Sequence, residues 1–186
     1  MYEIHETVET TLARHCAPVL LGRKPASLFG KPEWWDCEAM DKQSIGNVRL
    51  CVLHMPVKRP LIFAYQPKLL SDMLKISAVR NTLRSMGYSG TDLDTLLRQL
   101  KQKFLVSSVF PHEVGLFLGY PPEDVVAFIQ HKGQHCKLCG MWKVYHNAEN
   151  AARLFAEYKR CDYALARHIK NGGTIYDSNL TALLAG

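Results

Sequence analysis

The stretch from Phe110 to Tyr145 constrains the fold more than any other part of this sequence. It reads FPHEVGLFLGYPPEDVVAFIQHKGQHCKLCGMWKVY, and it contains two glycines, Gly115 and Gly119, within apolar sequence, followed by two adjacent prolines. Proline is favoured in the first turn of a helix, and a glycine within a helix lets a second helix approach closely. The spacing therefore predicts two short helices joined by a turn over residues 111–131, in the manner of a helix–turn–helix.

Hydrophobic periodicity predicts the elements on either side of this stretch. Residues 48–66 contain two short runs that favour strands, joined by PVKRP, which predicts a β-hairpin. MWKVY predicts a third strand near residues 140–145. Residues 22–35 are rich in glycine, proline and aromatic side chains, and we expect them to form a loop that covers the core. Apolar residues recur at three- and four-residue steps in the segments expected to be helical, which are residues 3–21, 68–87, 92–104 and 151–169.

These elements predict an α+β fold, in which a small antiparallel sheet packs against several helices. The chain of 186 residues is long enough to bury one core, so we expect a single domain over residues 1–186. Its apolar runs are shorter than the roughly 18 residues that span a bilayer, and its first residues are polar and acidic, unlike a signal peptide. We therefore expect a cytoplasmic protein with no membrane partner, whose six cysteines are thiols.

Four segments carry a resemblance to a known family. They are HCAPVLLGRKPASLF, FPHEVGLFLGYPPEDVVAFI, CGMWKVY and FAEYKRC. In combination they resemble the bacterial domain-of-unknown-function 3793 family, over nearly the full chain. The resemblance implies a small cytosolic protein, mainly from anaerobic Gram-positive bacteria, without an established activity. It supplies no catalytic residues, so the candidate sites are argued from the residues themselves.

The first candidate is a metal site at Cys136 and Cys139, whose two-residue spacing lets both thiolates of a tight turn point at one zinc or iron ion. A tetrahedral site needs four ligands, and a second pair with this spacing is absent, so Cys161 would supply a third thiolate. A redox role is the less favoured alternative, because the pair opens no predicted helix. In the simplest alternative, Cys136 lies in a loop and Cys139 begins a strand. The remaining ligand would come from His131, His135 or His146.

The second candidate is a thiol enzyme with Cys16 as the nucleophile. A helix that begins just after Cys16 would favour its thiolate, with His112 as the base and Glu113 as the residue that orients it. The alternative interpretation is structural. Cys16 would then lie on the apolar face of the first helix, and Glu113 would be a first-turn residue favoured by the helix dipole. Further candidates for the base and the orienting residue are His15 and Asp124.

The third candidate, nucleic-acid binding by the helix–turn–helix, is disfavoured by charge. The expected recognition helix begins with two prolines followed by Glu123 and Asp124, and two carboxylates repel a polyanion. The formal net charge of +6 comes from Lys and Arg spread along the chain, without a basic block. The sequence also lacks both GxxxxGK[ST] and GxGxxG, the two phosphate-binding patterns. We therefore expect the partner to be a small molecule or a protein.

The sequence as a whole favours a ligand- or protein-binding or regulatory module. We expect its site where the first helix, around His15 and Cys16, meets the segment of His112 and Glu113 and the strand after the cysteine pair. The alternatives are a thiol-dependent enzyme that uses Cys16 and His112, and a metal-binding protein that uses the cysteine pair.

Overall fold

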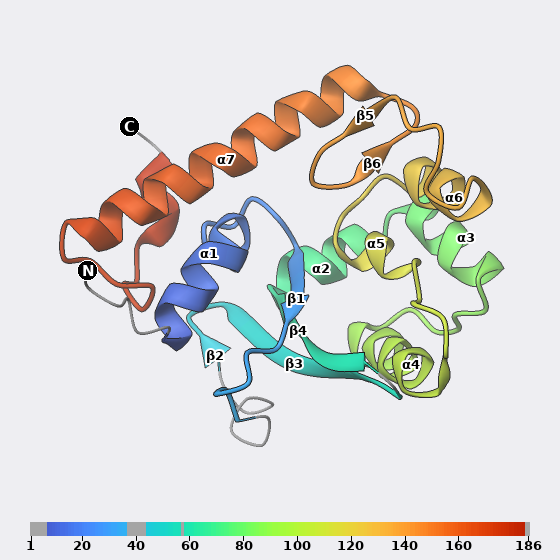
Figure 1. Cartoon of the computed structure of the whole chain (residues 1–186), viewed down its shortest axis with the longest axis horizontal. Helices are drawn as coiled ribbons and strands as arrows, with labels where there is room; N and C mark the ends of the chain where they lie inside the picture. The colour runs from blue at the N-terminus through green and yellow to red at the C-terminus, as the bar shows by residue number, and fades with distance from the viewer. Residues whose placement is uncertain (1–6, 37–43, 57, 185–186) are drawn as a thin grey trace.

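The structure is a computed structural model that describes residues 7–36, 44–56 and 58–184. Helices surround a sheet, and the longest helix, α7, runs along one side of the molecule (Figure 1). In chain order the elements are α1 (Val8–Leu20), β1 (Ala26–Gly30), β2 (Ser44–Ile45), β3 (Val48–Met55), β4 (Lys58–Tyr65), α2 (Pro67–Leu74), α3 (Ser77–Ser85), α4 (Leu93–Val106), α5 (Val114–Phe117), α6 (Pro122–Gln130), β5 (Leu138–Cys139), β6 (Lys143–Val144), α7 (Ala148–Lys170) and the 3-10 helix η1 (Leu180–Leu184).

The main sheet has four antiparallel strands in the order β1-β4-β3-β2, so the α+β prediction is confirmed. Its centre is the predicted hairpin, β3 and β4, in which Cys51 lies opposite Phe63. The edge strand β1 is a difference from the prediction, because residues 22–35 were expected to form a loop. Ala26–Gly30 instead pairs with β4, and Leu28 lies opposite Phe63. A five-residue strand flanked by prolines has too short a pattern to be recognised without its partner.

Alternation along the strands gives the sheet two buried faces. Side chains such as Leu53 and Phe63 point to one face and form the first core with α2, α3, α4 and α5. Their sequence neighbours, such as Val52 and Ile62, point to the other face and form the second core with α1, the second half of α7 and η1. Since successive side chains of a strand point to opposite faces, the sheet lies between the two cores and separates them.

Most predicted helices are present, with two differences. The expected helix 68–87 is divided into α2 and α3, because Ile76 has an extended conformation with ψ of 128°. The break lets the apolar residues of both helices reach the first core. No new helix begins just after Cys16, because Pro18 lies in the last turn of α1. The part of the predicted helix before residue 7 lies outside the described residues.

The helix–turn–helix-like pair is also present, but its first helix, α5, has only four residues. Gly119 ends it with a φ of 82°, and the N–H of Tyr120 donates to the carbonyl of Gly115 at 2.9 Å, a glycine-based helix end. A Cβ on Gly115 would lie 2.9 Å from Cγ2 of Val125, so this glycine allows the close contact between α5 and α6 that its position indicated.

The strand expected near residues 140–145 is Lys143–Val144, and it does not join the main sheet. It pairs with β5 in a separate two-stranded sheet, with Leu138 opposite Val144. The reason is the packing of its neighbours. Trp142 and Val144 are buried against Ala151 and Tyr158 of α7, which gives a third, smaller set of buried residues that we call the hairpin cluster.

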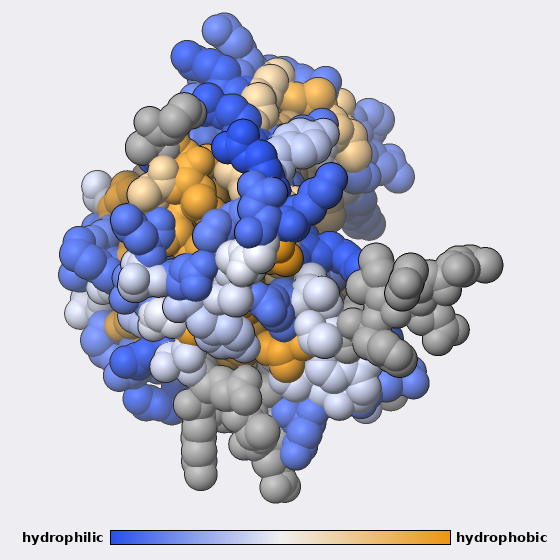
Figure 2. Space-filling model, turned by 90° about the vertical axis from the view of Figure 1, so that its left-hand side faces the viewer, coloured by the Kyte–Doolittle hydropathy of each residue, from blue (hydrophilic) through white to orange (hydrophobic). Residues whose placement is uncertain are grey.

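The surface at the end of the molecule that carries α1 and the C-terminal half of α7 is largely hydrophilic, with hydrophobic residues gathered in separate patches (Figure 2). Among the residues described, no helix combines the length and the apolar character needed to cross a membrane.

Candidate functional site

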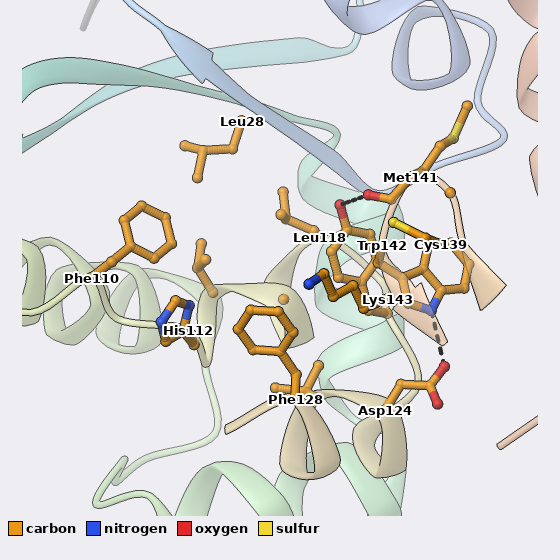
Figure 3. Close-up of a pocket in the computed structure, with 15 residues that line it drawn as sticks. Leu28, Phe110, His112, Leu118, Asp124, Phe128, Cys139, Met141, Trp142 and Lys143 are labelled. Carbon is orange, nitrogen blue, oxygen red and sulfur yellow. Dashed lines mark hydrogen bonds between the residues drawn. The ribbon is translucent and has the colours of Figure 1, made fainter. Parts of the chain in front are cut away.

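A pocket of about 380 Å³ lies between α5, α6 and the β5–β6 hairpin, with Leu28 of β1 at one side (Figure 3). All its other lining residues belong to residues 110–145, the stretch that we call the pocket segment. Apolar side chains dominate the lining, and the aromatic ones among them are Phe110, Tyr120, Phe128 and Trp142.

Trp142 is the best-fixed aromatic side chain of the pocket. Its ring stacks on Tyr120, with 4.9 Å between centroids, and meets Phe155 of α7 edge-on at 4.5 Å. Its indole Nε1–H donates to Oδ2 of Asp124 at 2.9 Å, so both the apolar body and the polar edge of the ring are satisfied. These three contacts leave the side chain of Trp142, which forms one wall of the pocket, little freedom to rearrange.

Asp124, which also lines the pocket, joins α6 to the hairpin through the indole of Trp142 (Figure 3). The residue is 3% exposed, and its Oδ1 accepts the backbone N–H groups of Tyr145 and His146 at 2.9 and 3.1 Å. Burial opposes ionisation, but the hydrogen bonds from Trp142, Tyr145 and His146 outweigh it and lower the pKa of the carboxyl group. From the sequence this residue was interpreted as part of a helix start. The sequence feature that could have pointed to a buried role is its position directly before Val125, the first buried apolar residue of α6.

His112 lies at the exposed rim of the pocket, between two aromatic rings. Its ring centroid is 5.4 Å from that of Phe110 and 4.9 Å from that of Phe128. Partial burial lowers the pKa of His112, and the charge of Lys58 acts in the same direction, while Glu113 opposes both. The imidazole is therefore neutral near pH 7, and it offers one hydrogen-bond donor and one acceptor.

Lys143 brings a positive charge into the pocket, where Figure 3 shows its amino group pointing toward the side of Phe128 and His112. The amino group donates to the backbone carbonyl of Gly133 at 2.5 Å. This side chain was not singled out from the sequence, because alternation along a two-residue strand does not reveal which face will border a cavity.

Of the predicted metal ligands, Cys139 lines the pocket and is exposed, and Cys136 is half-buried. Cys161 is buried in the second core, under α1. The three thiols are therefore not brought together, and the described residues contain no group of three or more His, Cys, Asp or Glu side chains placed to hold a metal ion.

Of the three predicted catalytic residues, Cys16 is separated from the adjacent pair His112 and Glu113. Cys16 is fully buried in the second core, and burial raises the pKa of its thiol despite the nearby charge of Lys24. His112 lies at the pocket, on the side of the sheet covered by the first core. Glu113 turns toward Lys103, whose Nζ lies 3.1 Å from Oε1 of Glu113. Three segments were expected to share one site. Only the segment of His112 and the segment of Cys139 border the pocket, and the first helix does not.

Comparison with known proteins gives one result. Residues 12–178 match the model of a family described as Protein of unknown function (DUF3793), and the match includes every residue that lines the pocket. No curated protein and no solved structure matches the chain. The description of the family names no activity, so the chemistry of the pocket is the guide to function.

Proposed function

The chain belongs to the DUF3793 family of proteins of unknown function, and from this premise we propose that it is a binding module, which holds a small and largely apolar molecule in the pocket between α5, α6 and the β5–β6 hairpin. The observation that carries the proposal is the composition of the cavity. Small-molecule sites are concave and mostly apolar, measure about 300–1,000 Å³ and contain a few convergent polar groups. This pocket has aromatic walls and a few polar side chains, among them His112 and Lys143.

The aromatic walls favour a planar ligand. Trp142 is already fixed by Tyr120, Phe155 and Asp124, so binding need not order it. Preorganised contacts lower the entropic cost of association, which is one of the main terms opposing the binding of a small molecule. Planar rings stack on aromatic side chains at centroid separations of about 4.5–7 Å, and the half-buried ring of Phe128 in the pocket lining offers such a partner.

The thiol of Cys139 allows a direct test, because this residue lines the pocket and Cys136, three positions earlier, does not. Two variants are compared, each retaining one thiol of the pair: Cys136→Ser and Cys139→Ser, both with Cys37→Ser, since Cys37 lies outside the described residues. The probe is the neutral dye N-phenyl-1-naphthylamine, whose fluorescence increases in apolar sites. Binding is titrated before and after alkylation with N-ethylmaleimide.

We expect saturable binding of the dye in both unmodified variants. Alkylation of Cys139 should fill the pocket and reduce the affinity at least about tenfold, whereas alkylation of Cys136 should leave it within about twofold. Mass spectrometry confirms which thiol has reacted. Equal affinities after the two modifications, or no saturable binding at all, would contradict the proposal. Substitution of Tyr163, an exposed aromatic residue of α7 outside the pocket, by alanine is the control for surface binding of the dye.

A further inference from the structure

The positive charge that Lys143 brings to the pocket has no ion-pair partner among the described residues. The side chain is half-buried. Within the described part of the chain its one hydrogen-bond acceptor is the uncharged carbonyl of Gly133, so two of its three N–H groups have no partner there. A charge that is partly withdrawn from water into apolar surroundings is costly unless an opposite charge accompanies it.

The one acid among the described lining residues does not neutralise this charge. Asp124 uses Oδ2 for Trp142, and it uses Oδ1 for the backbone of Tyr145 and His146. Figure 3 shows its carboxylate beyond the indole ring, on the far side from the amino group of Lys143. The carboxylate is committed to holding Trp142 and the hairpin backbone, so it does not pair with Lys143.

Two further groups reinforce the preference for an anion. Lys58 acts on His112 as a second positive charge, while the larger and opposite effect on His112 comes from Glu113, a carboxylate that is paired with Lys103. A neutral His112 carries one ring N–H, so it can donate a hydrogen bond to an oxygen at the pocket rim without adding the cost of a second buried charge. Apolar walls strengthen the attraction between an ammonium group and an anion, because the local dielectric constant is lower than that of water.

From this arrangement we infer that the natural ligand is an organic anion, in which an apolar, ring-bearing body lies between the aromatic walls and a carboxylate pairs with the ammonium group of Lys143. The inference rests on the proposed function and specifies the ligand class of the same pocket. His112 is assigned the second donor to the carboxylate. The aromatic walls recognise the body, and Lys143 provides the discrimination between an acid and its neutral analogue.

The test uses two ligands of nearly equal shape, 1-naphthoate and its neutral amide, 1-naphthamide. Each displaces N-phenyl-1-naphthylamine from the intact protein at pH 7.5 and low salt. We expect the carboxylate to bind about tenfold more tightly than the amide, which is the range for a hydrogen-bonded charge pair. This comparison needs no variant, so it does not depend on whether a substituted protein folds.

Variants then assign the preference to Lys143. Lys143→Met keeps the apolar stem and removes the charge, so it should abolish the preference for naphthoate while changing the affinity for naphthamide by less than about twofold. Lys143→Arg should retain most of the preference. Lys137→Met removes an exposed lysine of the same hairpin outside the pocket, and it should change neither affinity.

The outcomes separate the two proposals. Equal affinities for naphthoate and naphthamide, or a preference that survives in Lys143→Met, would overturn the anion inference and leave the binding module standing. Failure of the dye and of both naphthalene compounds to bind would overturn the binding module, and the inference with it. A preference for naphthoate that is lost only in Lys143→Met supports both.

Discussion

The four-stranded sheet and the pocket segment obtain their order in different ways. The sheet is held by alternating apolar side chains, and residues such as Ile62 and Phe63 are completely buried on its two faces. The pocket segment consists of short elements joined by residues with positive φ, which are Gly119, Lys132, Gly133 and His135. It depends on a few hydrogen bonds and ring contacts, with Asp124 at their centre. The comparison teaches that the scaffold is stabilised by area buried, and the site by a small number of specific contacts.

The largest expected effect is a difference in lost stability between alanine variants of two phenylalanines. Phe63→Ala removes a fully buried ring from the first core, and we expect it to lower the free energy of unfolding by about 3–5 kcal/mol. Phe128→Ala removes a partly exposed ring from the pocket and should lower the free energy of unfolding by only about 1–2 kcal/mol. It should also weaken the binding of the dye. Urea unfolding gives the first quantity, and titration with N-phenyl-1-naphthylamine gives the second. Equal losses of stability would show that the pocket segment belongs energetically to the core.

The next effect concerns Asp124. Asp124→Ala leaves the indole N–H of Trp142 and the backbone N–H of Tyr145 buried without their acceptor, so we expect a loss of about 2–4 kcal/mol in unfolding free energy at pH 7. The matched control is Asp92→Ala, which removes an exposed helix cap of α4 and should cost less.

At low pH the stability lost in Asp124→Ala should become smaller. Its native pKa is lowered, so its contribution is complete above the unfolded pKa of about 3.9 and is lost as the pH falls through the lower native value. The difference in unfolding free energy between the wild type and Asp124→Ala should therefore be constant from pH 7 to about pH 5 and should shrink below about pH 4. A difference that grew on acidification would contradict the lowered pKa.

A pair of glycines gives a smaller effect. Gly119 has a φ of 82°, and a Cβ at this position would lie 2.8 Å from Cγ of Pro25. We expect Gly119→Ala to cost about 1–3 kcal/mol, because it combines an unfavourable backbone conformation with a clash against a rigid ring. At Gly30, on the edge strand, a Cβ would meet no atom within 4 Å, so Gly30→Ala should change the stability by less than about 0.5 kcal/mol. Thermal unfolding of both variants checks the difference.

The smallest effect on stability is expected at Cys139. Cys139→Ser replaces an exposed side chain and should change the free energy of unfolding by less than about 0.5 kcal/mol. The reactivity of the thiols should nevertheless differ sharply. Cys139 should react with a disulfide reagent in the native protein, whereas Cys16 should react only on unfolding, because burial excludes the reagent and raises the pKa of its thiol. Peptide mapping after timed labelling distinguishes the two, and early labelling of Cys16 would revive the thiol-enzyme hypothesis.

The regular parts of the fold were predictable because their signals are local. The hairpin β3–β4 and the helices α4 and α7 follow from the periodicity of their apolar residues, and in the structure Asp92 and Asn147 cap the two helices. β1 was missed because Ala26–Gly30 becomes a strand through its pairing with β4, which lies far away in the sequence. The separation of α2 from α3 was hidden for a related reason, since apolar residues recur in the sequence at three- and four-residue steps across the break.

The candidate site was predictable only in part. His112 and Cys139 were singled out by residue type, and both line the pocket. Cys16 was chosen by the same reasoning, but which face of the sheet a helix covers depends on topology, and α1 covers the face opposite the pocket. Lys143 and Phe128 attract no attention in the sequence, because their importance comes from the cavity that other segments complete.

The continuity of α7 has a mechanical consequence. Its 23 residues form one rod roughly 34 Å long. Near its beginning Ala151 contributes to the hairpin cluster behind the pocket, and near its end Leu165 is anchored in the second core beside α1. If the β5–β6 hairpin shifts when a ligand binds, either α7 tilts as a whole or the contacts between the hairpin and α7 are broken. In the first case the movement would reach the second core on the opposite face of the sheet, because α7 packs against both regions.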